Sequence, residues 1–238
     1  MNDPWEDLAE WWVSEVASDP SYDRDVVPLL ESLLEDLAGR LVLDLGCGEG
    51  RVMQILRGLG ARVVGCDLNT DLARVASAQG PVIVGRLPGL DYLRDEVFDV
   101  VVSVLVLEHL DDWQTLLTEA GRVTAPGGSL LIVLNHPLFT APGSAPIVDP
   151  ENGEVLWRWG EYLSEGETAE RAGDRSITFY HRPLAHLLNA AAKAGWWLEE
   201  AAERPASHQR RAPTLRVMEH QDQIPRLLGV RWRREPFK

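Results

Sequence analysis

Short apolar runs alternate with amphipathic segments through most of the chain. The apolar runs cover residues 41–45, 62–67, 82–84, 97–107 and 130–134. Hydrophobic side chains recur at helical spacing in the neighbouring segments, at residues 25–38, 52–59, 70–79, 113–123 and 184–191. Single helices between buried strands favour βαβ units. We therefore expect an α/β domain with a largely parallel, doubly wound sheet and helices on both faces.

The first amphipathic segment has sequence signals for both helix ends. Asp25 suits an N-cap, and Pro28 stands in the first turn, where its missing N–H leaves no broken helical bond. Gly39 follows the last apolar position, as a C-cap glycine would. The pattern predicts one helix over 25–38, within a helical N-terminal cap that comprises residues 1–38 of a single domain, 1–238.

The alternation stops at residues 136–182. This stretch is rich in Pro, Gly and acidic residues, and a long irregular stretch is typical of functional or disordered segments. It also contains several aromatic side chains, which argue against disorder: Phe139, Trp157, Trp159, Tyr162, Phe179 and Tyr180. We expect an ordered insertion that covers the carboxyl edge of the sheet and the substrate.

The regular pattern returns after the insertion. It predicts a helix at 184–191, an apolar run at 196–198, a loop at 204–222 and a last strand at 224–232.

The charge balance narrows the class of partner. The 23 Lys and Arg residues against 37 Asp and Glu residues give a formal net charge of −14. Nucleic-acid affinity rests on basic side chains that displace counterions. We therefore expect no nucleic-acid partner, and the dense basic cluster at 231–234 fits a solvated tail.

Other features bear on compartment and metal binding. The N-terminus lacks the basic and apolar regions of a signal peptide, and no apolar run reaches the length of a membrane span. The two cysteines, Cys47 and Cys66, cannot form a disulfide framework, and neither has a Cys or His at ligand spacing. We expect a cytoplasmic protein without a membrane or metal partner.

A glycine loop follows the first apolar run. Asp44 is followed by Gly46-x-Gly48-x-Gly50, directly before an amphipathic segment. Ligands of open α/β sheets bind beyond the carboxyl ends of the strands, and glycines permit close approach where a Cβ would block it. Asp67 ends the next strand, 21 residues after Gly46, where its carboxylate can accept hydrogen bonds from both hydroxyls of a ribose.

A dinucleotide is the alternative ligand for this geometry. Its fingerprint is G-x-G-x-x-G, whose third glycine would fall on Arg51. Asp44 is poorly placed for a diphosphate but suits the cationic amino group of a methionine. The spacing favours S-adenosylmethionine, and disfavours an NAD-dependent reductase.

Residues 41–135 resemble the class I S-adenosylmethionine-dependent methyltransferases of the small-molecule, type-11-like kind. The resemblance covers about 40% of the chain and rests on five stretches in the family's order: Val42–Gly50, Val64–Asp67, Phe98–Ser103, Leu107–Leu110 and Arg122–Gly128. It implies a Rossmann-like seven-stranded sheet whose last strand, formed by 224–232, runs antiparallel. It also implies S-adenosylmethionine as the cofactor and methyl transfer as the activity.

The resemblance assigns cofactor contacts by position. Asp67 would bind the ribose, Leu68 would pack on the adenine, and the segment after the fourth strand would line the other side. Family members commonly have an acid after the third strand, but here Arg86 and Leu87 stand there, and we expect their backbone groups to substitute. The cofactor-binding residues implied are Asp44, Gly46, Cys47, Gly48, Gly50, Asp67, Leu68, Arg86, Leu87, Ser103, Val104 and Leu105.

Three histidines are candidates for a general base, because histidine titrates near neutrality. His109 follows the fourth strand, His136 ends the fifth, and His181 closes the insertion. Each has an alternative role: His109 near the cofactor without acting as a base, His136 in a turn before a proline, and His181 in orienting the insertion. His208 and His220 are weaker candidates.

Aromatic residues could line the acceptor site. In the resemblance, the N-terminal segment with Trp11 and Trp12 folds over the cofactor pocket. Trp157 and Trp159 could present one aromatic face to a substrate, or could anchor the insertion to the sheet.

The leading hypothesis is O- or N-methylation of a small-molecule acceptor. The alternatives are a methyltransferase that acts on tRNA or protein, against which the net charge of −14 stands, and a protein that binds S-adenosylmethionine without turnover. The sequence does not identify the acceptor, the methylated atom or the oligomeric state.

Overall fold

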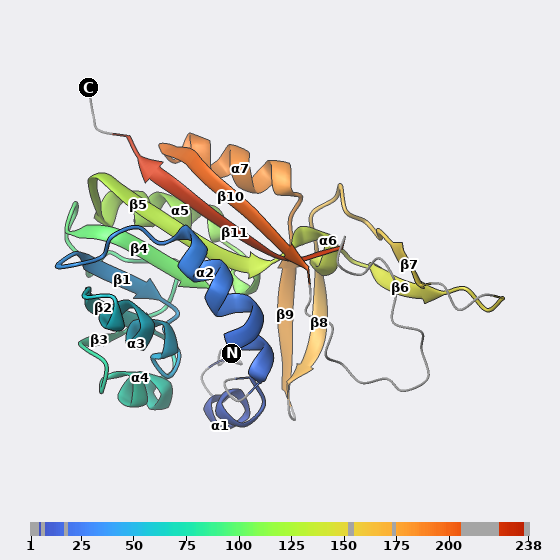
Figure 1. Cartoon of the computed structure of the whole chain (residues 1–238), viewed down its shortest axis with the longest axis horizontal. Helices are drawn as coiled ribbons and strands as arrows, with labels where there is room; N and C mark the ends of the chain where they lie inside the picture. Colours follow the sequence, from blue (N-terminus) through green and yellow to red (C-terminus); the bar gives the residue numbers. More distant parts are fainter. Residues whose placement is uncertain are drawn as a thin grey trace.

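The structure is a computed structural model that describes residue 5 and residues 8–16, 19–151, 155–172, 175–205 and 224–235. The described residues contain a seven-stranded sheet of order β10-β11-β5-β4-β1-β2-β3 (Figure 1). Its strands are β1 (Leu41–Leu45), β2 (Arg62–Asp67), β3 (Val82–Val84), β4 (Phe98–Val104), β5 (Thr124–Asn135), β10 (Trp196–Pro205) and β11 (Pro225–Arg234).

Strand directions follow the expected topology. β1 pairs in parallel with β2 and β4, β2 with β3, and β4 with β5. β11 runs antiparallel to both β5 and β10. The predicted doubly wound sheet, mostly parallel with an antiparallel last strand, is confirmed. Parallel strands end at the same edge, so the loops after β1, β2 and β4 lie together.

Helices cover both faces of the sheet. One buried cluster joins the sheet to α2 (Val27–Leu33) and α3 (Arg51–Gly58), with Ala76 of α4 (Thr70–Ala76). The other joins it to α5 (Trp113–Val123) and α7 (Leu184–Lys193). Side chains of β1 alternate between the two clusters, because successive strand residues point to opposite faces. Burial of both faces explains why the central strands are continuous apolar runs.

The prediction for the first helix is wrong at both ends. Asp25 lies inside a π-helical turn, η3 (Tyr22–Val26), that continues into α2, so it is not an N-cap. The helix ends at Leu33, because Leu34 has extended backbone angles, and the Arg231 guanidinium donates a hydrogen bond of 2.8 Å to the Leu33 carbonyl. Leu37 is buried nonetheless. The apolar position that suggested a longer helix is therefore buried by an irregular segment.

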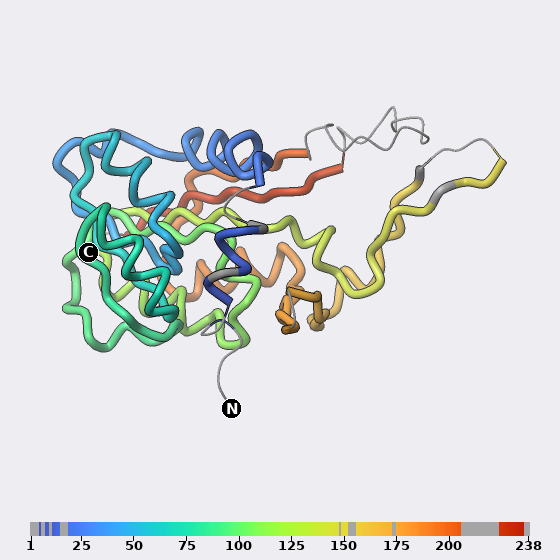
Figure 2. Tube along the Cα trace, turned by 90° about the horizontal axis from the view of Figure 1, so that it is seen from below, coloured from blue at the N-terminus to red at the C-terminus, as the bar shows by residue number. Residues whose placement is uncertain are grey.

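The segment after β5 contains a short helix and two hairpins. They are α6 (Pro137–Thr140), β6 (Ala145–Val148) with β7 (Val155–Arg158), and β8 (Gly166–Ala172) with β9 (Arg175–His181). The β6–β7 hairpin projects from the body of the molecule (Figure 2). β9 packs against a 3₁₀ turn, η4 (Leu107–His109), directly after β4.

At the N-terminus, α1 (Ala9–Trp11) leads into the π-helical turn η2 (Trp12–Val16). We call Trp5 and residues 8–16 the N-terminal segment. The predicted loop at 204–222, with His208 and His220, lies outside the described residues except for its first two positions, which extend β10. Among the described residues, no helix has the length and hydropathy needed to cross a membrane.

Candidate cofactor and acceptor site

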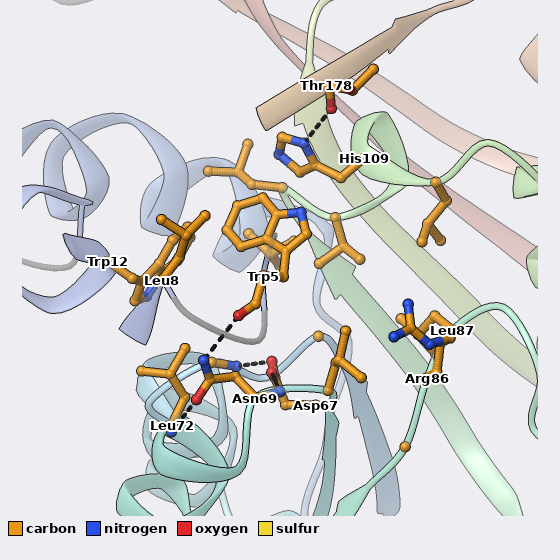
Figure 3. A pocket seen from close by; sticks show the side chains of 18 of the residues that line it. Trp5, Leu8, Trp12, Asp67, Asn69, Leu72, Arg86, Leu87, His109 and Thr178 are labelled. Atoms are coloured by element: carbon orange, nitrogen blue, oxygen red, sulfur yellow. Dashed lines mark hydrogen bonds between the residues drawn. The ribbon is translucent and has the colours of Figure 1, made fainter. Parts of the chain in front are cut away.

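A cavity of about 460 Å³ opens at the carboxyl edge of the sheet. Its walls come from the glycine loop, the loops after β2, β3 and β4, the N-terminal segment and β9 (Figure 3). Eight predicted cofactor residues line it: Gly46, Gly48, Asp67, Leu68, Arg86, Leu87, Val104 and Leu105. The other four are buried and do not line it: Asp44, Cys47, Gly50 and Ser103.

Backbone hydrogen bonds hold the glycine loop against the end of β2. The Gly46 N–H donates to the Cys66 carbonyl at 2.8 Å. The Gly48 N–H donates to one Asp67 carboxylate oxygen, and the Asn69 N–H donates to the other, both at 2.8 Å. Burial raises the pKa of Asp67, whereas these two hydrogen bonds lower it. Asp67 therefore both faces the cavity and fixes the loop.

The glycines of the loop serve different purposes. Gly48 has φ +54° and lines the cavity, and a Cβ built on it would point toward the Trp12 indole, 3.5 Å from its nitrogen. Gly50 has φ +92°, and a Cβ there would lie 2.9 Å from the Ala76 Cα. Gly50 therefore permits α3 to begin in close contact with α4, and its requirement for glycine is a packing requirement.

Asp44 is a buried carboxyl group beneath the loop. It is 1% exposed, and its Oδ2 has no hydrogen-bond partner among the described residues. Burial raises its pKa to about 8, and the neighbouring charges of Asp67 and Glu49 act in the same direction. A buried carboxyl oxygen without a partner carries a free-energy penalty. A ligand with a cationic amino group would remove that penalty, so the residues present fit the predicted methionine end.

The N-terminal segment closes one side of the cavity. The Trp12 Nε1–H donates to Glu49 at 2.6 Å, and the Asn69 side-chain amide donates to the Trp5 carbonyl at 2.9 Å. Leu8 is 2% exposed and also lines the cavity. These contacts tie the segment to the glycine loop and to the start of α4.

We expect Trp12→Phe to accelerate the dissociation of S-adenosylhomocysteine by about tenfold. The change keeps an aromatic ring but removes the N–H that donates to Glu49, and a hydrogen bond to a charged group contributes about 1.5–3 kcal/mol. Stopped-flow displacement would measure the rate. Trp197→Phe is the matched control, because Trp197 is exposed on the edge strand β10. An unchanged rate in Trp12→Phe would contradict this role of the N-terminal segment.

His109 stands at the opposite end of the cavity from Asp67 and Asn69 (Figure 3). Its ring packs edge-on against Trp5, with centroids 4.8 Å apart, and against Phe179, at 4.5 Å. Its Nδ1 lies 3.1 Å from the Thr178 carbonyl. Because a carbonyl only accepts, Nδ1 must carry the proton, and in the neutral ring Nε2 carries the lone pair.

The other two candidate histidines do not line the cavity. His136 Nδ1 accepts from the Leu138 N–H at 3.1 Å and caps α6, while its Nε2 lies 2.7 Å from Glu203. Burial lowers the pKa of His136, and Glu203 opposes that shift. Both ring nitrogens are thus engaged in a structural contact.

His181 is placed similarly, at the end of β9. Its Nδ1 lies 3.0 Å from the Thr140 hydroxyl and its Nε2 lies 2.9 Å from the Tyr162 carbonyl. It therefore joins α6 to the chain before β8, and burial lowers its pKa. Of the three histidines singled out from the sequence, His109 alone lines the cavity.

Several lining residues were not predicted from the sequence. Trp5 and Leu8 come from the N-terminal segment, Asn69 from the cap of α4 and Thr178 from β9. Trp5, Leu8 and Trp12 have the spacing of one helix face. This spacing could have predicted from the sequence that Trp5 and Leu8 lie on the same side as Trp12.

The structure separates the members of both aromatic pairs. Trp12 lines the cavity, as expected of the N-terminal segment that folds over it. Trp11 packs in a small cluster with Ile177 and Phe179, so Trp12 rather than Trp11 faces the cavity. The Trp157 ring packs at a tilt against the Phe139 ring, with centroids 4.4 Å apart, and Trp159 is 63% exposed.

Comparison with known proteins identifies the same part of the chain and the same family as the resemblance found in the sequence. A family model described as a methyltransferase domain matches residues 43–132. The chain is 31% identical over 190 residues to the ubiquinone biosynthesis O-methyltransferase of Brucella ovis, an alignment that covers 71% of this chain and 75% of that protein. The chain belongs to the class I S-adenosylmethionine-dependent methyltransferases. The cofactor of this methyltransferase is therefore S-adenosylmethionine, and the prediction of cofactor and family is confirmed.

Two further similarities agree with this membership. The methyltransferase is 31% identical over 158 residues to the ubiquinone biosynthesis O-methyltransferase of Mesorhizobium japonicum. The alignment covers 60% of this chain and 62% of that protein. The chain thus spans less than two thirds of that relative. A solved S-adenosylmethionine-dependent methyltransferase from Mesorhizobium loti superposes with a TM-score of 0.72 at 26% identity, covering 87% of this chain and 96% of that one.

Proposed function

We propose that this methyltransferase transfers the methyl group of S-adenosylmethionine to a hydroxyl group of a small molecule, with His109 as the general base. The observation that carries the proposal is the placement of His109. It lines the cavity while the Thr178 carbonyl holds its Nδ1–H, so that the lone pair resides on Nε2.

The residues proposed to hold the cofactor line the cavity, except for Asp44, which is buried beneath the glycine loop. The buried Asp44 carboxyl would bind the methionine amino group, since its Oδ2 has no partner among the described residues. Asp67 would bind the ribose hydroxyls and Leu68 would pack on the adenine. We keep the backbone of Arg86 and Leu87 as the adenine contacts, because both residues line the cavity.

When bound, the cofactor supplies a methyl group that its sulfonium centre already activates. The chain must then position the acceptor and remove its proton. A fixed tautomer allows His109 to accept that proton at Nε2, and the Thr178 carbonyl would stabilise the cationic ring through Nδ1–H. The rings of Trp5 and Phe179 flank the imidazole and reduce its contact with water, which strengthens electrostatic interactions in the site.

The lining beside His109 supports a small acceptor of low charge. Trp5, Val106, Leu110 and Tyr180 contribute apolar or aromatic surface there, and Thr178 contributes a polar group. The two relatives described above are named as O-methyltransferases of ubiquinone biosynthesis, which supports a hydroxyl acceptor. The N-terminal segment and β9 contribute to the walls of the cavity, and the net charge of −14 disfavours a tRNA substrate.

Release of S-adenosylhomocysteine tests the proposal with three acceptor classes: 3,4-dihydroxybenzoate and related catechols, simple aromatic amines, and unmodified tRNA. We expect turnover with members of the hydroxyl class. Turnover with tRNA alone would contradict the proposal. Binding of S-adenosylhomocysteine without turnover of any of these acceptors would favour the alternative, a protein that binds the cofactor without catalysis.

A further inference from the structure

The turn that carries His109 is too short to fix itself. η4 comprises three residues, Leu107–His109, and its backbone hydrogen bonds run only from the His109 N–H to the Val106 carbonyl and from the Leu110 N–H to the Leu107 carbonyl, at 2.9 and 3.2 Å. A single 3₁₀ turn has poor hydrogen-bond geometry and few such bonds. Contacts from elsewhere must therefore hold its orientation.

Two side chains supply such contacts. Glu108, within η4, accepts hydrogen bonds at Oε1 from the Asn135 backbone N–H and side-chain amide, at 3.1 and 2.9 Å, and the Arg182 guanidinium binds the backbone of the turn. Arg182 follows directly after β9, and its Nη1 donates to the Leu107 carbonyl at 3.0 Å while its Nη2 donates to the Leu110 carbonyl. These two carbonyls belong to the first residue of η4 and to the residue after its end. The planar fork of the guanidinium thus binds the turn on both sides of His109.

Aromatic rings fix the guanidinium itself. Its central carbon lies 5.0 Å from the centre of the Trp113 ring and 5.6 Å from that of Tyr180, within the range of cation–π attraction. Burial lowers the pKa of Arg182 to about 10, and the nearby carboxylates of Glu165, Glu108 and Asp111 oppose that shift. Arg182 therefore remains a cation at neutral pH, held between α5 and β9.

The strand that leads to Arg182 also orients the His109 ring. Thr178, four residues earlier on β9, accepts the Nδ1–H hydrogen bond through its carbonyl. The position of His109 relative to Thr178 therefore depends on the junction between η4 and β9. We propose that Arg182 is a positioning residue that joins the η4 turn to β9 and so directs His109 Nε2 into the cavity. Its catalytic purpose rests on the proposed function; its effect on the imidazole does not.

A lysine cannot replace this clamp. Its ammonium is a compact charge on a flexible stem, whereas the guanidinium bonds to both carbonyls in one plane while it stacks on aromatic rings. Arg182→Lys keeps the positive charge and much of the apolar stem. It therefore separates a requirement for charge from a requirement for geometry.

Nitrogen-15 NMR of the imidazoles, with S-adenosylhomocysteine bound and at about pH 9, where an ordinary histidine is neutral, tests the proposal. His109→Gln identifies the His109 signals. We expect wild type and the control Arg171→Lys, at an exposed position of β8, to show His109 protonated at Nδ1. Arg182→Lys and Arg182→Gln should show a mixture of both tautomers, with affinity for S-adenosylhomocysteine within about twofold of wild type.

Retention of the pure Nδ1–H tautomer in Arg182→Lys would overturn the proposal. If Arg182→Gln fails to fold, the lysine variant alone decides, because it preserves the charge. The result does not depend on turnover. A shifted tautomer together with an unchanged kcat in His109→Gln would support the positioning role while contradicting His109 as the base.

Discussion

Asp44→Asn is expected to weaken the binding of S-adenosylhomocysteine by about 100-fold at pH 8 to 9. The side chain is 1% exposed and its Oδ2 has no hydrogen-bond partner among the described residues. The proposed partner is the ligand's cationic amino group. Removing one partner of a buried charge pair costs about 3 kcal/mol or more, which corresponds to about two powers of ten in affinity. Isothermal titration calorimetry would measure the change.

The same substitution is expected to stabilise the protein without ligand at high pH. Burial raises the pKa of Asp44 to about 8, whereas an unfolded aspartate titrates near about 4. Between these two pKa values, Asp44 is deprotonated in the unfolded state but protonated in the folded state. The free energy of unfolding therefore falls as the pH rises, and this loss levels off above about pH 8. Asn removes this loss, which is on the order of 5 kcal/mol at its limit. The gain should vanish toward pH 4.

Binding by wild type should also depend on pH. A bound ammonium favours ionised Asp44, so below about pH 8 binding releases a proton and affinity falls by up to about tenfold per pH unit. Asp44→Asn should show no such slope. Asp71→Asn is the matched control, since Asp71 is exposed at the start of α4. Equal affinities of wild type and Asp44→Asn at about pH 8 to 9 would contradict the role of Asp44.

His109→Gln is expected to lower kcat by about 10²- to 10⁴-fold, the usual contribution of a general base. The glutamine amide can still donate to the Thr178 carbonyl, but it cannot accept a proton from the acceptor hydroxyl. Affinity for S-adenosylhomocysteine should stay within about twofold, because Asp67 lies at the opposite end of the cavity from His109 and Asp44 is buried beneath the glycine loop. Single-turnover kinetics with the acceptor identified by the screen would separate the chemical step from binding.

Two matched variants control for the loss of a buried imidazole. His136→Gln and His181→Gln should reduce thermal stability, since both rings bridge separate elements of the fold. Neither should reduce kcat comparably, because neither ring lines the cavity. A kcat for His109→Gln close to that of wild type would contradict the proposed base.

The sheet was predictable because each of its central strands is buried on both faces. The bounds predicted for β1 and β2, at 41–45 and 62–67, are those observed. The first helix was not predictable from apolar spacing alone. Leu37 is buried within an irregular segment, and the Leu33 carbonyl at the end of the helix accepts a hydrogen bond from Arg231, 198 residues away.

The residues proposed for the cofactor side of the site could be singled out because they are local in sequence. Asp44, the glycines and Asp67 come from two neighbouring strands and their loops. The proposed acceptor side comprises Trp5, His109 and Thr178, which are far apart in the sequence and meet only in the folded structure. Spacing along the chain carries no information on that meeting, so three histidines remained equivalent candidates until the fold separated them.

A crystal structure with S-adenosylhomocysteine bound tests the central claim most directly. The account predicts the amino group within hydrogen-bond distance of Asp44, the ribose hydroxyls on Asp67, and the open face of the sulfur directed toward His109. A ligand bound in the reverse direction, with its adenine at Asp44, or bound outside the cavity would contradict it.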